Sequence, residues 1–220
     1  EASADLKAEQ GASTVSVAGM TATWDTRNNR FDPMQGSVLF GSTDLAGGAV
    51  GGDKDFYRLQ GGGSAYASHL NDRLVLESRI RAGIVESYAG TAEVPIFERF
   101  FAGGSNTIRG FQERRVGPRD AVSNDPIGGE AMLLGTVEEV MTIVKDERGK
   151  PILKGSVFYD VGNVWRRVAD FASSMESGVG VGARVNTPIG PIRLDVGFPN
   201  TRLDQNEKRK PRLHFNISRS

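Results

Sequence analysis

The residues of this sequence whose types and spacing suggest chemistry are arginines and carboxylates, and the chemistry they suggest is ion pairing. A basic stretch, RFFAGGSNTIRGFQERRVGP, runs from Arg99 to Pro118 between two segments with strand character. Segments that follow it offer two carboxylates, Glu138 in TVEEV and Asp160 in FYDVG. A guanidinium presents a rigid fork of donors that matches a carboxylate. Ordering a long loop costs about 1–2 kcal/mol of backbone entropy per residue, so an ordered loop needs an anchor.

Composition and motifs argue against an enzyme. The 220 residues include no cysteine and only two histidines, His69 and His214, so we expect no thiolate or His-rich metal centre. The 27 basic residues balance the 27 acidic ones, which gives no reason to expect nucleic acid as a partner. No G-x-S-x-G, H-E-x-x-H or Walker sequence occurs, and no helical pattern follows the glycine-rich GGGS at Gly61. We therefore expect no catalytic residues, no metal and no cofactor.

The elements that must position the charged residues are β-strands, because apolar residues alternate along most of the chain. In SGVGVGARVNTPIGPIRLDVGFP, from Ser177, valines and Ala183 share one face, while glycines and Arg184 share the other. A turn rich in Pro and Gly at 187–191 leads to a second alternating segment, so the pair predicts an antiparallel hairpin. The alternation predicts nine strands, at 14–26, 36–46, 55–68, 74–86, 130–144, 154–165, 177–187, 191–199 and 211–219.

The connections between these strands alternate in length, as they do in outer-membrane barrels. The short turns lie near 27–35, 69–73, 145–153 and 188–190. The longer segments lie near 47–54, 87–129, 166–176 and 200–210. No run of 18 apolar residues predicts a transmembrane helix, but a spanning strand needs only about 9–11 residues.

The two faces of the strands decide which solvent lies outside. One set of faces is aliphatic, and the other carries glycines and charges, including Arg79, Arg81, Asp160, Arg184, Arg193 and Asp195. If the aliphatic face meets lipid, the charges line a wet lumen, and we favour this interpretation over a soluble barrel or sandwich. Glu139 falls on the lipid face, where mid-bilayer burial would cost on the order of a few kcal/mol, so we expect it near the membrane boundary or at a bulge. Trp24 and Trp165 lie at strand ends, which is consistent with aromatic girdles, although many tryptophans at strand ends simply pack against neighbouring residues.

The stretch RFFAGGSNTIRGF resembles the sixth extracellular loop of the outer-membrane protein insertases of the BamA type. The hallmark of that loop is a (V/I)RG(F/Y) tetrad, here Ile108, Arg109, Gly110 and Phe111. Further segments resemble the family in the same order: WDTRNNRFDPMQGS, GGEAMLLGTVEEV, SVFYDVGNVW, NTPIGPIRLDVGFP and RLHFNISRS. The resemblance covers nearly the whole chain from about Thr14.

The resemblance implies an all-β fold, an antiparallel transmembrane β-barrel of outer-membrane type. The family barrel has sixteen strands, and this chain would supply about the last nine of them. Residues 1–220 are therefore expected to form the C-terminal part of a barrel domain, without the early strands and the periplasmic POTRA domains. The long extracellular loop, 87–129, would fold inward and carry the tetrad.

The same resemblance assigns roles to residues. Arg109 would meet Glu138 and Asp160 on the inner wall, Gly110 would let the backbone pass close to that wall, and Phe111 would pack on it. The last strand, with Leu213, Phe215 and Ile217, would form one lip of the barrel seam. The alternative is that Arg109 is a solvated loop arginine and that the two acids are unrelated lumen charges.

The function implied by the resemblance is the assembly and insertion of β-barrel proteins into the bacterial outer membrane, by pairing of a client strand with the seam. The alternative on the same barrel type is a TamA-type or two-partner secretion pore that translocates polypeptides. The implied partners are the outer-membrane bilayer with its lipopolysaccharide, unfolded outer-membrane β-barrel clients and accessory lipoproteins. A soluble ligand-binding barrel is a more distant option.

Overall fold

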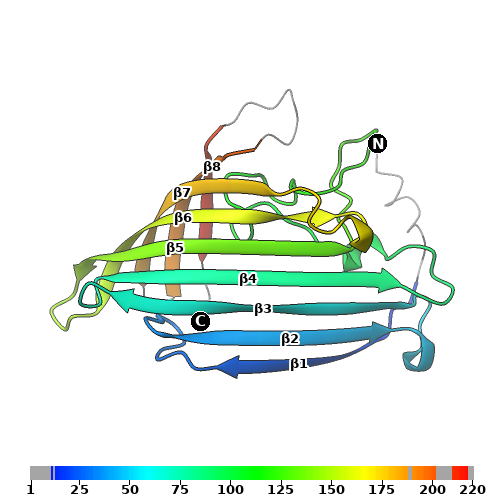
Figure 1. The fold of residues 1–220 in the computed structure, drawn as a ribbon, viewed down its shortest axis with the longest axis horizontal. Helices are drawn as coiled ribbons and strands as arrows, with labels where there is room; N and C mark the ends of the chain where they lie inside the picture. The colour runs from blue at the N-terminus through cyan, green and yellow to red at the C-terminus, as the bar shows by residue number, and fades with distance from the viewer. Residues whose placement is uncertain (1–10, 12, 188–189, 202–209, 218–220) are drawn as a thin grey trace.

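The computed structural model of the chain describes residues 11, 13–187, 190–201 and 210–217. Its strands form one antiparallel sheet in which each strand pairs with its neighbours along the chain (Figure 1). They are β1 (Val17–Asp25), β2 (Gly36–Ala46), β3 (Phe56–His69), β4 (Leu74–Ser87), β5 (Ala131–Lys145), β6 (Pro151–Trp165), β7 (Glu176–Thr187), β8 (Gly190–Pro199) and β9 (Arg212–Ile217). The predicted nine strands are confirmed, although β1 begins at Val17 rather than at 14 and β6 at Pro151 rather than at 154.

Helical structure in the described residues is limited to three short 3-10 helices. They are η1 (Gly48–Val50), η2 (Ile96–Glu98) and η3 (Val168–Asp170), and each lies in one of the longer connections. None of the described helices has the length and apolar character that crossing a membrane requires.

The aliphatic residues of the strands lie on the outer, exposed face of the sheet. Val181 of β7 is 53% exposed and Leu194 of β8 is 45% exposed, although both are large apolar side chains. A run of exposed aliphatic residues on one face is what a lipid-facing barrel wall requires, since strand side chains alternate between lipid and lumen. The fold is therefore a segment of an outer-membrane barrel wall, as the alternation predicted.

The sheet curves so that strands far apart in its order face one another across an interior. Arg184 of β7 lies 3.2 Å from Glu77 of β4, and Arg193 of β8 lies 2.8 Å from Glu138 of β5. Figure 1 shows the bend at β7 and β8, behind the plane of β3 to β5. Among the described residues, β1 and β9 are the two edges of the sheet and do not pair with each other.

The connection between β4 and β5 lies inside this curve and supplies much of the apolar core. Its Ile108, Phe111 and Val116 are buried together with residues from the inner sides of the strands. The wall residues of this core are Ala46, Phe56, Val85, Met132, Leu134 and Val164. The loop therefore fills the interior of the sheet.

The turn between β1 and β2 also reaches inward. Asp32, in the middle of this turn, forms an ion pair with Lys154 of β6, whose side chain is only 8% exposed. Asn28 and Asn29 accept hydrogen bonds from backbone N–H groups of the turn and hold its shape. The turn thus closes over one end of the interior.

Two expectations concern residues of the outer surface. Glu139 lies near the end of its strand pair, in agreement with a position near the membrane boundary: it pairs with Leu76, two positions from the last pair of the β4–β5 ladder, Leu74–Met141. Its carboxylate lies 3.4 Å from His69. Of the two interpretations of Trp165, the structure supports packing and contradicts the girdle position. Its side chain is buried, and its ring packs against Phe171 at 5.0 Å, because the connection after β6 folds back over the end of that strand.

Candidate functional site

The candidate site is the place where the tetrad Ile108–Phe111 meets the inner wall of the sheet. Backbone hydrogen bonds within the loop fix the conformation of the segment around the tetrad. The Gly104 N–H donates to the Ile108 carbonyl at 3.2 Å, and the Val116 N–H donates to the Ala102 carbonyl at 2.9 Å. Ile108 is fully buried in the apolar core and thereby fixes the position of the residue after it. Arg109 consequently points at the wall rather than into solvent.

Arg109 binds Asp160 of β6 through a bidentate pair. Its Nε lies 2.6 Å from Oδ2 and its Nη2 lies 2.7 Å from Oδ1, while the backbone N–H of Arg109 donates to the same Oδ2 at 3.0 Å. The remaining Nη1 donates to Glu138 of β5 at 3.1 Å. All three side chains are almost fully buried. Charge-assisted bidentate pairs are among the strongest hydrogen bonds in proteins, and a buried charge requires such partners.

An aromatic ring completes the environment of the guanidinium. Phe158 shares the inner face of β6 with Asp160, and its ring centroid lies 3.3 Å from Cζ of Arg109. A cation over the face of an aromatic ring is stabilised by the ring quadrupole, by on the order of 2 kcal/mol when the pair is desolvated. The Phe158 ring therefore contacts the flat face of the Arg109 guanidinium, while the Asp160 carboxylate binds the N–H groups along the edge of the guanidinium.

Glycines on both sides of the contact allow the loop backbone to lie against the wall. Gly110 has a φ of +96°, and a Cβ there would lie 2.9 Å from the carbonyl carbon of Phe198. On the wall, a Cβ at Gly178 would overlap the Arg109 carbonyl oxygen, and one at Gly197 would lie 2.8 Å from the Arg109 carbonyl carbon. We call the wall positions Glu138, Phe158, Asp160, Gly178 and Gly197 the loop seat.

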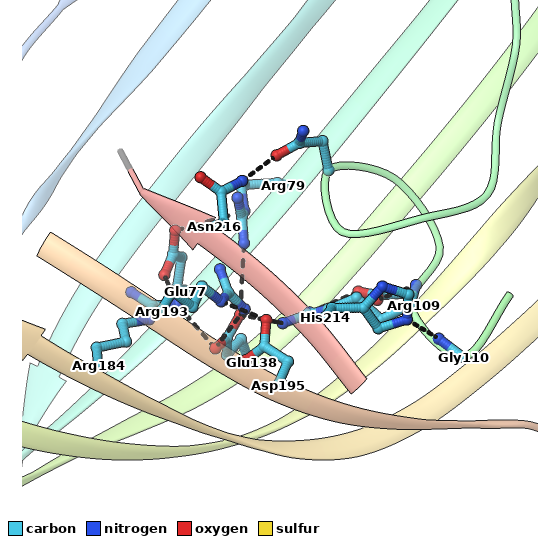
Figure 2. A network of polar contacts seen from close by, with 12 residues as sticks. Glu77, Arg79, Arg109, Gly110, Glu138, Arg184, Arg193, Asp195, His214 and Asn216 are labelled. Carbon is cyan, nitrogen blue, oxygen red and sulfur yellow. Dashed lines mark hydrogen bonds and ion pairs between the residues drawn. The ribbon is translucent and has the colours of Figure 1, made fainter. Parts of the chain in front are cut away.

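The loop seat belongs to a larger ion network centred on Glu138 (Figure 2). Besides Arg109, this carboxylate contacts Arg79 at 3.4 Å, Arg184 at 2.8 Å and Arg193 at 2.8 Å. Arg193 also pairs with Asp195 at 2.6 Å. The network joins four arginines (79, 109, 184 and 193) to four carboxylates (77, 138, 160 and 195), so its formal charges cancel. Such a network can hold the loop in place by ion pairing without changing any covalent bond.

No group of His, Asp and Glu residues in the described part of the chain is arranged to hold a metal ion. The carboxylates of the network are occupied by arginines instead. The arrangement is suited to binding and positioning.

Comparison with known proteins gives the family of the chain. The model of the Omp85 superfamily domain matches residues 2–220. The chain belongs to the Omp85 superfamily. Two curated relatives, each named outer membrane protein assembly factor BamA, are similar to it. The protein from Nitratidesulfovibrio vulgaris is 32% identical over 214 residues, and the one from Neorickettsia risticii is 32% identical over 206 residues.

The alignments cover most of this chain and a minor part of each relative. They span 96% and 89% of this Omp85 chain but 26% of each BamA protein, so the chain spans about a quarter of the length of these relatives. The crystal structure of BamA from Haemophilus ducreyi lacking POTRA domains 1–3 matches 90% of this chain and 41% of its own, with a TM-score of 0.76 and 22% identity. That likeness supports the barrel fold. The match to the Omp85 family and the bacterial BamA relatives place this chain in the bacterial outer membrane.

The seam residues named from the sequence lie apart from the loop seat. Leu213, Phe215 and Ile217 of β9 are exposed on the outer face, at 67%, 59% and 47%. The residues between them, His214 and Asn216, point inward and contact the loop. The structure thus brings Arg109, Glu138 and Asp160 together and separates them from the apolar side of the seam strand.

Sequence reasoning missed several residues of the Omp85 site. Asp195, Arg184 and Arg193 were assigned to the lumen face but not to the partners of the tetrad, because their contact depends on how far the sheet curves. Phe158 lies on the same inner face as Asp160, two residues away, and that spacing is the signal that could have identified it. The glycines of the GVGVG segment were assigned to the lumen face without a role, and the loop backbone that lies on Gly178 supplies one.

Proposed function

We propose that the protein containing this chain assembles β-barrel proteins in the outer membrane. We further propose that the loop, bound in the loop seat, holds the barrel wall in the conformation that assembly requires. The observation that carries the proposal is the buried tetrad arginine: Arg109 is held by Asp160 and Glu138 on two adjacent strands. The relatives named as assembly factors support the same role. No covalent step is required, so the protein acts as a template and not as an enzyme.

The proposed template is the barrel seam, of which β9 forms one lip. Over the described residues β9 pairs with β8, and the second lip of the seam would come from strands outside this chain. An exposed strand edge can accept an incoming strand through backbone hydrogen bonds, with side chains giving the fit. Unpaired backbone groups are costly in lipid, so a client strand gains by pairing with this edge before it finds its own neighbours.

We infer the partners from the outer surface and from the family. The aliphatic outer face would contact the hydrocarbon of the bilayer, and the loop end of the sheet would face lipopolysaccharide. Unfolded outer-membrane barrel proteins would be the clients, and accessory lipoproteins would be further partners. A TamA-type or two-partner secretion pore is the competing proposal, and it requires the loop to leave the interior so that a polypeptide can pass.

The test is client assembly by the full-length protein in proteoliposomes, with the wild type compared with Arg109→Ala. We expect the variant to fold less stably and to assemble clients several-fold more slowly. Arg114→Ala is the matched control, because Arg114 is an exposed arginine of the same loop that stacks on Phe101 outside the loop seat. Equal client assembly by wild type and Arg109→Ala would contradict the role of the seated loop. Polypeptide passage into the vesicle without membrane insertion would favour the secretion pore.

A further inference from the structure

The inner face of β9 is hydrogen-bonded to the loop on both sides of Arg109. His214 Nε2 accepts a hydrogen bond from the backbone N–H of Gly110 at 2.9 Å. Asn216 Nδ2 donates to Oδ1 of Asn106 at 2.6 Å. Figure 2 shows both contacts reaching from the terminal strand to the loop. The strand that forms one lip of the proposed template is therefore tied through its inner face to the seated loop.

The Gly110 N–H depends on this contact. Gly110 is buried, and among the described residues His214 is the acceptor of its backbone hydrogen. The wall behind it is backbone: Gly197 lies so close that a Cβ there would overlap the Gly110 nitrogen. A buried backbone donor that loses its acceptor costs free energy until another acceptor reaches it. Moving His214 away therefore destabilises the tetrad backbone.

The proposed strand templating requires the terminal strand to move. Over the described residues β9 pairs with β8 at Ile192–Gly197, and its large apolar residues face outward rather than into the core. Elements with few buried contacts open at lower free energy than the rest of a structure.

The Arg109 ion pairs do not involve β9. Asp160 lies on β6, Glu138 on β5, and Asp195, whose Oδ2 lies 3.6 Å from Nη1 of Arg109, on β8. Displacement of β9 would therefore leave the loop anchored through Arg109 while it frees the Gly110 N–H and the Asn106 side chain. The two sets of contacts thus lie on different strands, one on β5, β6 and β8 and the other on β9.

We propose that His214 and Asn216 are positioning residues that couple the position of β9 to the conformation of the loop at Asn106 and Gly110. A client strand that displaces β9 on pairing with it breaks these two hydrogen bonds and loosens the loop. By linkage, a change that loosens the loop at these positions makes β9 easier to displace by the same factor. This inference rests on the proposed strand-templating function. It adds that binding of a client strand breaks the hydrogen bonds of His214 and Asn216 to the loop.

The contact can be followed with a cysteine pair, since the chain contains no cysteine of its own. The full-length protein, with any cysteines outside this chain replaced, carries Asn106→Cys and Asn216→Cys and is treated with a short, reducible thiol crosslinker. The matched control pairs Asn106→Cys with Arg81→Cys, because Arg81 of β4 reaches the Asn106 carbonyl at 3.4 Å without involving β9. We expect a high yield for both pairs at rest. A client stalled on β9 should lower the 106–216 yield several-fold and leave the 81–106 yield unchanged.

A second comparison needs no client. His214→Gln keeps a side-chain acceptor for Gly110, and His214→Leu removes it. We expect the 106–216 yield at rest to be near wild type in His214→Gln and several-fold lower in His214→Leu. An unchanged yield in His214→Leu would overturn the coupling, as would an unchanged 106–216 yield in samples where the client is captured on β9. Failure to capture any client would instead count against the proposed function, and the His214 comparison would still decide the coupling.

Discussion

Arg109 holds Asp160 through three hydrogen bonds, two from the guanidinium and one from its own backbone N–H. One carboxylate thus fixes both the side chain and the main chain of the same residue, which sets the loop at one point on β6. Glu138 differs, since it takes a single hydrogen bond from Arg109 and shares its oxygens with three other arginines. The two acids are therefore expected to make unequal contributions to loop anchoring.

Double-mutant cycles measure how strongly Arg109 is coupled to Asp160 and to Glu138. We expect Arg109→Ala to couple strongly with Asp160→Ala, at the upper end of the roughly 0.5–3 kcal/mol seen for residues in direct contact, and less strongly with Glu138→Ala. The physical reason is that, among the described residues, Asp160 has Arg109 as its ion-pair partner, whereas Glu138 keeps Arg184 and Arg193 when Arg109 is removed. The measurement is the free energy of unfolding of the full-length protein in detergent, followed by heat-modifiability on gels. Additivity of Arg109→Ala and Asp160→Ala would show that the contact does not contribute in solution.

Gly110→Ala is expected to destabilise the seated loop. The left-handed φ of +96° alone costs a residue with a side chain about 1–3 kcal/mol, and the new Cβ would also press on the backbone at Phe198 and Pro199. The control is Gly90→Ala in the same loop, where a Cβ meets nothing within 4 Å. Limited proteolysis of the loop should detect faster cleavage in Gly110→Ala than in Gly90→Ala. Equal cleavage rates would mean that the loop does not need the close approach at Gly110.

The wall glycine Gly178 gives a complementary prediction. Gly178→Ala places a methyl group where the Arg109 carbonyl lies, so the loop must shift away from β7 and weaken the pairing of Arg109 with Asp160. Overpacking of this kind costs typically about 1–3 kcal/mol. Gly41→Ala in β2 is the matched control, since a Cβ there has no neighbour within 4 Å. The free energy of unfolding should fall in Gly178→Ala and stay near wild type in Gly41→Ala. A fall of the same size in both variants would point to strand propensity instead of loop contact.

Much of the fold could be predicted because apolar and polar residues alternate along each strand, and this alternation shows which residues share a face. The parity of Glu138 and Asp160 placed both on the inner face, and the tetrad motif supplied their partner. The contacts of Glu138 with Arg184 and Arg193 could not be predicted in this way. They connect strands that are not neighbours in the sheet, and their existence depends on its curvature, which no local pattern encodes.

Two other residues show the same limit. His214 alternates with the apolar residues of its strand, yet its partner is the backbone of Gly110, 104 positions away in sequence, and a backbone N–H leaves no mark in a sequence. The position of Trp165 at a strand end was compatible with a girdle and with packing. Its burial comes from Phe171, which lies in a connection whose path the sequence does not specify.

The inward turn between β1 and β2 supplies the last prediction. Asp32 pairs with Lys154 across the interior, and the Lys154 side chain is nearly buried while that of Asp32 is 34% exposed. Asp32→Asn would leave the ammonium group of Lys154 without its carboxylate, at a cost on the order of 1 kcal/mol after allowing for solvent screening at Asp32. We expect faster amide hydrogen exchange in residues 26–35 of Asp32→Asn, with exchange at Arg109 unchanged, because the loop seat shares no hydrogen bond with this turn among the described residues. Asp72→Asn, in the neighbouring exposed turn, serves as the control for loss of one acidic charge. Equal exchange in the two variants would indicate that the ion pair with Lys154 does not hold the turn, and the hydrogen bonds of Asn28 and Asn29 would then be sufficient to fold it inward.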